Sequence, residues 1–61
     1  MNDEQFEKLV SLVLDLHNAA ATAGMSLING STEKEIDVAY FNAGNARLDI
    51  YDFVDELMKG N

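Results

Sequence analysis

The sequence contains no cysteine, no proline and no tryptophan. Without cysteine the chain can form no disulfide, and with a single histidine it has almost no means of holding a structural metal ion. Without proline nothing forces a break in a long helix. No segment approaches the ~18 uninterrupted apolar residues that a membrane-spanning helix needs. A chain of 61 residues is therefore expected to form one domain and to gain stability by self-association.

Positive charge is also scarce, because 4 basic residues stand against 11 acidic ones and the net charge is -7. Such a charge repels phosphate backbones and anionic lipid surfaces, so we expect no direct nucleic-acid or membrane binding. Basic proteins are the favoured electrostatic partners. The absence of cysteine and of a signal-like apolar run predicts a cytoplasmic location, and the small size alone suggests a phage or another mobile element as the source.

A turn near the midpoint organises the chain. Asn29-Gly30 is a turn dipeptide, and Gly30 can adopt a left-handed backbone conformation without a Cβ clash. Thr32 and Glu35 have the spacing of a capping box, in which each side chain accepts a hydrogen bond from the other residue's backbone N–H. The sequence therefore predicts that one helix ends just before this segment and another begins within it.

Both halves of the chain show the apolar spacing of three and four residues that is typical of an α-helix. The pattern continues through Gly24, so we expect the first helix to be unbroken there, although glycine is a poor helix former. The sequence predicts an all-α fold, an antiparallel two-helix hairpin that forms a single domain over residues 1–61. Its helices are expected at 3–28 and 32–59, with the turn at 29–31.

Each expected helix carries a stripe of seven apolar residues that suits contact with the other helix. The stripes comprise Phe6, Leu9, Val13, Leu16, Ala20, Ala23 and Leu27 in the first half and Ile36, Ala39, Ala43, Ala46, Ile50, Phe53 and Leu57 in the second. Gly44 is expected either to permit tight packing between the helices or to leave a shallow groove that a partner's side chain can enter. Because 5 of the 14 stripe residues are alanine, a solitary hairpin has little core with which to offset its ordering entropy.

Large apolar residues also lie outside the second stripe. Phe41 and Leu48, seven residues apart, fall on the opposite side of the helix, where a solitary hairpin would carry charge. Burying such side chains is worth about 1.5–3 kcal/mol each. We therefore expect a homodimer that forms a four-helix bundle, and an intermolecular surface that includes Phe41, Leu48 and Tyr51. That surface either joins two copies or holds a protein target, and in the second case the dimer is expected on the side of Val10, Leu14 and Val54.

Charged residues of the second half complete the candidate partner-binding site. Arg47 is expected either to form an ion pair with a residue such as Asp37 or Asp52, or to act with a tyrosine as an interface anchor. Four carboxylates of this half are joined on the helix surface by steps of three and four residues: Asp49, Asp52, Asp55 and Glu56. They are expected to form either a solvated surface or a docking surface for a basic partner. The candidate residues are Phe41, Leu48, Tyr51, Arg47, Asp49, Asp52, Asp55 and Glu56.

No arrangement of residues indicates catalysis or cofactor binding. Asp15 precedes His17 by two residues, and residues two apart on a helix do not face each other, so they form no acid–base pair. No histidine follows a glutamate at the Glu-x-x-His spacing of di-metal helical bundles. We expect no enzymatic activity, no cofactor and no metal site.

Two functions fit these properties. The favoured one is a non-enzymatic interaction module, an adaptor or inhibitor of a protein target. The alternative is a nucleic-acid mimic that occupies the basic cleft of a DNA- or RNA-handling protein, because carboxylates one helical turn apart are separated by ~5–6 Å, similar to phosphate spacing. Salt dependence separates the two, since binding by mimicry weakens steeply with ionic strength.

Overall fold

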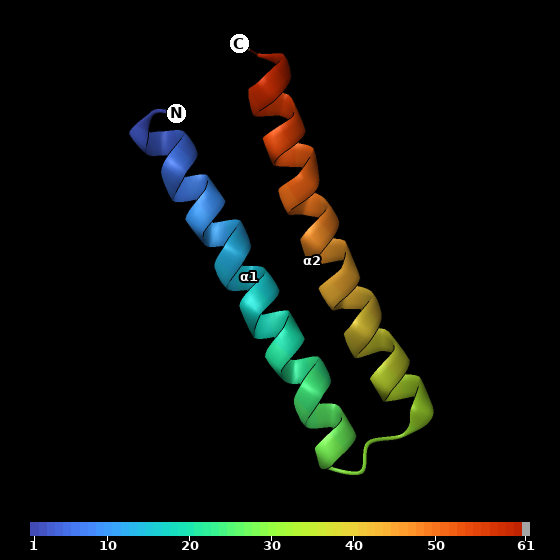
Figure 1. Ribbon diagram of the computed structural model, residues 1–61. Helices are drawn as coiled ribbons and strands as arrows, with labels where there is room; N and C mark the ends of the chain where they lie inside the picture. Colours follow the sequence, from blue (N-terminus) through green and yellow to red (C-terminus); the bar gives the residue numbers. More distant parts are fainter. Residues whose placement is uncertain (61) are drawn as a thin grey trace.

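The computed structural model describes residues 1–60 as two long α-helices that lie side by side and run in opposite directions (Figure 1). Helix α1 spans Asp3–Ile28 and α2 spans Glu33–Lys59, and the described residues contain no strand. Asn61, the last residue of the expected domain, lies outside the described residues. The prediction of an all-α fold with two packed helices is confirmed. The start of α1 and the end of α2 both lie at the end of the hairpin opposite the turn (Figure 1).

The turn ends α1 with Gly30 in the left-handed conformation, at φ 70°. The backbone N–H of Asn29 donates to the carbonyl oxygen of Met25 at 2.9 Å, and that of Ser31 donates to the carbonyl oxygen of Ser26 at 3.2 Å. These bonds satisfy carbonyl groups that the end of a helix otherwise leaves without partners. The turn thus reverses the chain while two of its backbone N–H groups close the end of α1.

Both helices begin with a capping box. The Thr32 hydroxyl accepts a hydrogen bond from the Glu35 backbone N–H at 3.2 Å, and the Glu35 carboxylate accepts one from the Thr32 N–H at 3.3 Å. At α1 the Asn2 side chain accepts from the Gln5 N–H at 2.8 Å, and the Gln5 side chain accepts from the Asn2 N–H at 3.0 Å. Asparagine followed three residues later by glutamine is a known helix-start signature, so the capping box of α1 also follows from residues close in sequence.

Substitution of Gly30 tests the turn. Gly30→Ala is expected to lower the free energy of unfolding by about 1–2 kcal/mol, because a Cβ atom disfavours the left-handed conformation by that amount. Asn29→Ala is the matched control, since Asn29 has an ordinary φ of -84° and should tolerate alanine. Urea denaturation followed by circular dichroism, at one protein concentration, measures both. Equal stability of the two variants would remove this role from Gly30.

The predicted stripe of α2 is the surface that faces α1, since all seven of its residues are buried or half-buried. On α1 only alternate members of the predicted stripe are covered, among them Leu9, Leu16 and Ala23. The other four are exposed, and the residue before each of them is half-buried instead. The exposed residues are Phe6, Val13, Ala20 and Leu27, and the residues that replace them are Gln5, Leu12, Ala19 and Ser26. The predicted α1 stripe is therefore wrong at alternate positions.

The width of the apolar arc on α1 explains this rotation. Leu12 and Val13 are adjacent and both apolar, as are Ala19 and Ala20, so the periodicity fits two neighbouring stripes equally well. In the structure Leu12 lines a hollow together with Phe53 of α2, and Val13 stays in solvent. More than half of the apolar residues of α1 are thus left exposed.

The core between the helices is small. Among residues 1–60 the buried apolar side chains are Ala23, at 1% exposure, and Phe53, at 8%. By contrast, 15 large apolar side chains in the same range are exposed. Neither described helix contains an apolar stretch sufficient to cross a lipid bilayer. The hairpin therefore keeps much more apolar side chain in solvent than it buries.

Two glycines within the helices are not explained by packing inside the hairpin. Helix α1 continues through Gly24, as expected. A Cβ atom at Gly24 or at Gly44 would meet no described heavy atom within 4 Å outside its own helix backbone. The expectation that Gly44 permits tight packing of α2 against α1 is therefore wrong. Each glycine costs roughly 1 kcal/mol of helix stability relative to alanine.

Candidate interaction surfaces

The line of contact between the helices divides the rest of the surface into two flanks and two outer faces, because residues seven apart lie on the same side of a helix. Hollows between the helices identify each flank. One hollow lies beside Asp49 and is lined by Lys8 and Leu12 of α1, and we call this side the Asp49 flank. The other lies beside Tyr40 and is lined by Leu16 of α1, and we call this side the Tyr40 flank.

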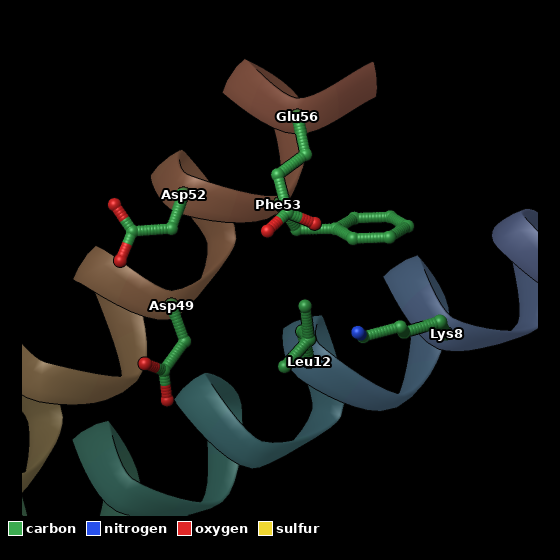
Figure 2. A pocket seen from close by; sticks show the side chains of 6 residues that line it. All are labelled: Lys8, Leu12, Asp49, Asp52, Phe53 and Glu56. Atoms are coloured by element: carbon green, nitrogen blue, oxygen red, sulfur yellow. The ribbon is translucent and has the colours of Figure 1, made fainter. Parts of the chain in front are cut away.

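The Asp49 flank is polar and largely acidic. It comprises Lys8, Asp15 and Thr22 from α1, with Met1 just before that helix, and Glu35, Asn42, Asp49 and Glu56 from α2. Its hollow, of about 210 Å³, is closed from below by Leu12 and Phe53. Figure 2 shows the Phe53 ring reaching from α2 toward Lys8 and Leu12, with the Asp49 and Asp52 carboxylates gathered on the α2 side.

Lys8 is the basic residue that lines this hollow. Its Nζ atom lies 5.1 Å from the centroid of the Phe53 ring, a cation–π contact worth about 0.5–1 kcal/mol at an exposed site. No group of three histidine, cysteine or acidic residues within residues 1–60 is placed to hold a metal ion. The carboxylates of this flank therefore form a surface that is exposed to solvent and could attract a cationic partner.

The Tyr40 flank is apolar along most of its length. It comprises Phe6, Val13, Ala20 and Leu27 from α1 and Glu33, Tyr40, Arg47 and Val54 from α2. Its exposed fractions are large: 58% for Phe6, 56% for Leu27 and 48% for Tyr40. The hollow on this side, of about 310 Å³, is lined by Leu16, Tyr40, Ala43, Gly44 and Arg47. Apolar side chains from both helices thus form one continuous surface.

The outer face of α2 is narrower, since it belongs to one helix. It comprises Lys34, Phe41, Leu48 and Asp55. Phe41 is 68% exposed and Leu48 is 52% exposed. Asp55 forms an ion pair with Lys59 at 3.6 Å, and because both side chains are mostly in solvent the pair contributes little stability. Phe41 and Leu48 therefore project from the hairpin with charged residues at either end.

The eight residues of the predicted partner-binding site are all exposed, but they lie on different sides of α2. Phe41, Leu48 and Asp55 are on the outer face. Asp49 and Glu56 are on the Asp49 flank with Asp52 at its edge, and Arg47 is on the Tyr40 flank with Tyr51 at its edge. Successive residues on a helix point about 100° apart, so one short segment supplies residues to three surfaces. The structure does not bring them together in one site.

The structure also places Arg47 and His17, two residues discussed in the sequence analysis. Arg47 forms no ion pair with any residue of 1–60, so the expected pair with Asp37 or Asp52 is absent from the described chain. His17 is exposed, with its side chain outside the contact between the helices.

Sequence reasoning missed the α1 half of the Tyr40 flank. The spacing of the apolar residues predicts a contact between the helices that includes Phe6, Val13 and Leu27. It does not predict that they are exposed. The signal that could have identified them is the width of the apolar arc on α1, which exceeds what one neighbouring helix can cover.

Comparison with known proteins adds no family to this description: no family model matches the chain, and neither the curated proteins nor the solved structures contain a significant match.

Proposed function

We propose that this chain is a small non-enzymatic interaction module, an adaptor or inhibitor of a protein target. In this proposal two copies of the hairpin form a homodimer, which is a four-helix bundle. The observation that carries the proposal is the imbalance of the apolar side chains, with two buried and 15 large ones exposed among residues 1–60. Extensive apolar surface on a small domain is typical of proteins that bind other proteins. Two hairpins that share one core would cover part of this surface and leave the rest for a target.

The outer face of α2 is the proposed target-binding surface. Phe41 and Leu48 are one heptad apart and project into solvent, so together they can enter a groove on a partner as helical anchors do. Acidic residues lie on both sides of them, and with a net charge of -7 they favour a target whose groove has a basic rim. Tyr51 lies beside this face, where it can extend the contact.

A double substitution tests this surface. Phe41→Glu with Leu48→Glu is expected to leave a folded dimer, because both side chains are already exposed, and to reduce target binding at least tenfold. Ser11→Glu with Asn18→Glu is the matched control, since these residues are also exposed, seven apart and able to add two charges. Pull-down from cells of the source organism, with identification by mass spectrometry, measures binding, and analytical ultracentrifugation measures the dimer.

The outcomes separate the claims. Loss of the target by the Phe41/Leu48 variant, with retention by the control, supports the outer face as the binding surface. A Phe41/Leu48 variant that stays folded, dimeric and fully competent for its target shows that this face has no role. If both variants lose the target equally, added negative charge is responsible and the apolar anchors are not.

The second candidate function is mimicry of a nucleic acid, and the Asp49 flank supports it. Asp49, Asp52 and Glu56 are exposed on adjacent turns of α2 and present a row of carboxylates beside one hollow. A protein that uses this row would lose affinity steeply as salt rises, because charge-driven contacts are screened. A partner held by Phe41 and Leu48 would show a shallow salt dependence. Measuring the dissociation constant between low and high salt distinguishes the two functions.

A further inference from the structure

We infer that the Tyr40 flank is the surface through which two copies of this chain pair, so that the four helices of two hairpins share one core. The inference rests on the proposed function for one point, that the module is a homodimer. Beyond that point, the inference identifies the surface that forms the dimer. This surface leaves the outer face of α2 free for a target. Three properties of the described residues support it.

The first is the way α1 divides its apolar stripe. Leu9 and Leu16 pack toward α2, whereas Phe6, Val13 and Leu27 alternate with them in sequence and lie exposed on the Tyr40 flank. In a four-helix bundle each helix directs such a stripe toward the bundle axis, between two neighbouring helices. Helix α2 is one of those neighbours. The exposed half of the stripe is therefore oriented to meet a second pair of helices.

The second is the distribution of charge. Each copy carries a net charge of -7, so two copies repel each other wherever their carboxylates are opposed. The Asp49 flank has four acidic residues and one basic residue, Lys8. The Tyr40 flank has one acidic residue, Glu33, at the turn end, and one basic residue, Arg47; Asp3 and Asp37 lie at its border. Of the two flanks, the Tyr40 flank is the one on which like-charged copies can approach closely.

The third property is the open space beside two glycines on the Tyr40 flank, together with the area of this flank. Gly24 and Gly44 both border the Tyr40 flank, and no described heavy atom outside their own helices lies within 4 Å of a Cβ position there. Two missing side chains let another helix backbone come near. The described chain measures 46 × 18 Å across the two helices, a footprint comparable with the ~800 Å² per partner of a standard specific interface. An outer face is only one helix wide and therefore offers a smaller contact area.

Adjacent residues supply a matched test. Ala20 and Ala21 are both exposed in the hairpin, but Ala20 is on the Tyr40 flank and Ala21 is on the outer face of α1. Ala20→Glu is expected to raise the dimer dissociation constant about 100-fold or more, because each copy would place a carboxylate within the shared core. Ala21→Glu adds the same charge and should change it less than about threefold. Val13→Glu and Leu14→Glu form a second pair with the same expectation.

Sedimentation equilibrium over a range of concentrations gives the dissociation constants, and circular dichroism under the same conditions reports folding. The inference is supported if the variants at Ala20 and Val13 dissociate while those at Ala21 and Leu14 remain dimeric. It is supported equally if the flank variants unfold on dilution and the outer-face variants do not, since then folding itself depends on this contact. Dimers of unchanged affinity for Ala20→Glu and Val13→Glu would overturn it.

The same measurements separate this inference from the proposed function. A wild-type dimer that Ala21→Glu and Leu14→Glu dissociate, and that the flank variants leave intact, overturns the assignment of the surface and keeps the dimer. A wild-type chain that sediments as a folded monomer at millimolar concentration overturns the dimer, and the assignment with it. Target binding through Phe41 and Leu48 is measured independently of both.

Discussion

Ala23→Glu is expected to unfold the hairpin at neutral pH. Ala23 is the most buried residue of the described chain, at 1% exposure, and it lies on α1 where that helix faces α2. A glutamate there would bring a carboxylate into the contact between the helices, and an unpaired buried charge costs about 3–5 kcal/mol. A domain with so small a core has little stability in excess of that cost. Loss of the helical circular dichroism signal at room temperature is the expected measurement.

The control for Ala23→Glu is Ala21→Glu, which makes the same change two residues earlier at an exposed position. It should retain the wild-type spectrum and lie within ~0.5 kcal/mol of wild-type stability. Both are compared at one protein concentration, because dimer formation makes stability depend on concentration. A folded Ala23→Glu variant would mean that α1 can rotate about its axis and present another side to α2, which the wide apolar arc of α1 would permit.

Phe53→Ala is expected to destabilise the hairpin by about 3–5 kcal/mol, the usual cost of removing a buried phenylalanine side chain. Phe53 is the large side chain with the least exposure, at 8%, and its ring also holds the Lys8 ammonium at 5.1 Å. Removing the ring takes away the aromatic side chain that lines the hollow on the Asp49 flank together with Leu12. The expected result is a hairpin that is largely unfolded in the absence of a partner.

Phe41→Ala provides the comparison, since it removes the same side chain from the same helix at a position that is 68% exposed. Its effect on the stability of an isolated hairpin should be below ~0.5 kcal/mol. Urea denaturation followed by circular dichroism gives both values. A Phe53→Ala variant as stable as Phe41→Ala would show that the contact between the helices at the open end adds nothing to stability.

Local signals in the sequence were sufficient for much of this fold. The left-handed Gly30 and the reciprocal bonds of Thr32 and Glu35 depend only on residues close in sequence, so the turn could be predicted. The stripe of α2 could be predicted because its apolar residues of the right spacing form one clear line from Ile36 to Leu57. In each case one arrangement satisfied the pattern better than any other.

The side of α1 that faces α2 could not be predicted in the same way. Leu12 and Val13 are similar in size and hydropathy, so burying one or the other changes the free energy little, and packing against Phe53 decides between them. The candidate site suffered from the same ambiguity. The sequence pattern places Phe6 and Val13 in the contact between the helices. It therefore does not predict that these residues join Tyr40 and Val54 on one exposed flank.

The turn is the one covalent link between the two helices, and this has a consequence for the order of folding. Ser26 and Ala39 meet beside the turn and are close in sequence, whereas Leu12 and Phe53 meet far from it and are separated by most of the chain. Closing the short loop costs less entropy, so contacts should form first at the turn and extend toward the open end. Substitutions at Gly30 should therefore slow refolding, while those at Phe53 should chiefly accelerate unfolding.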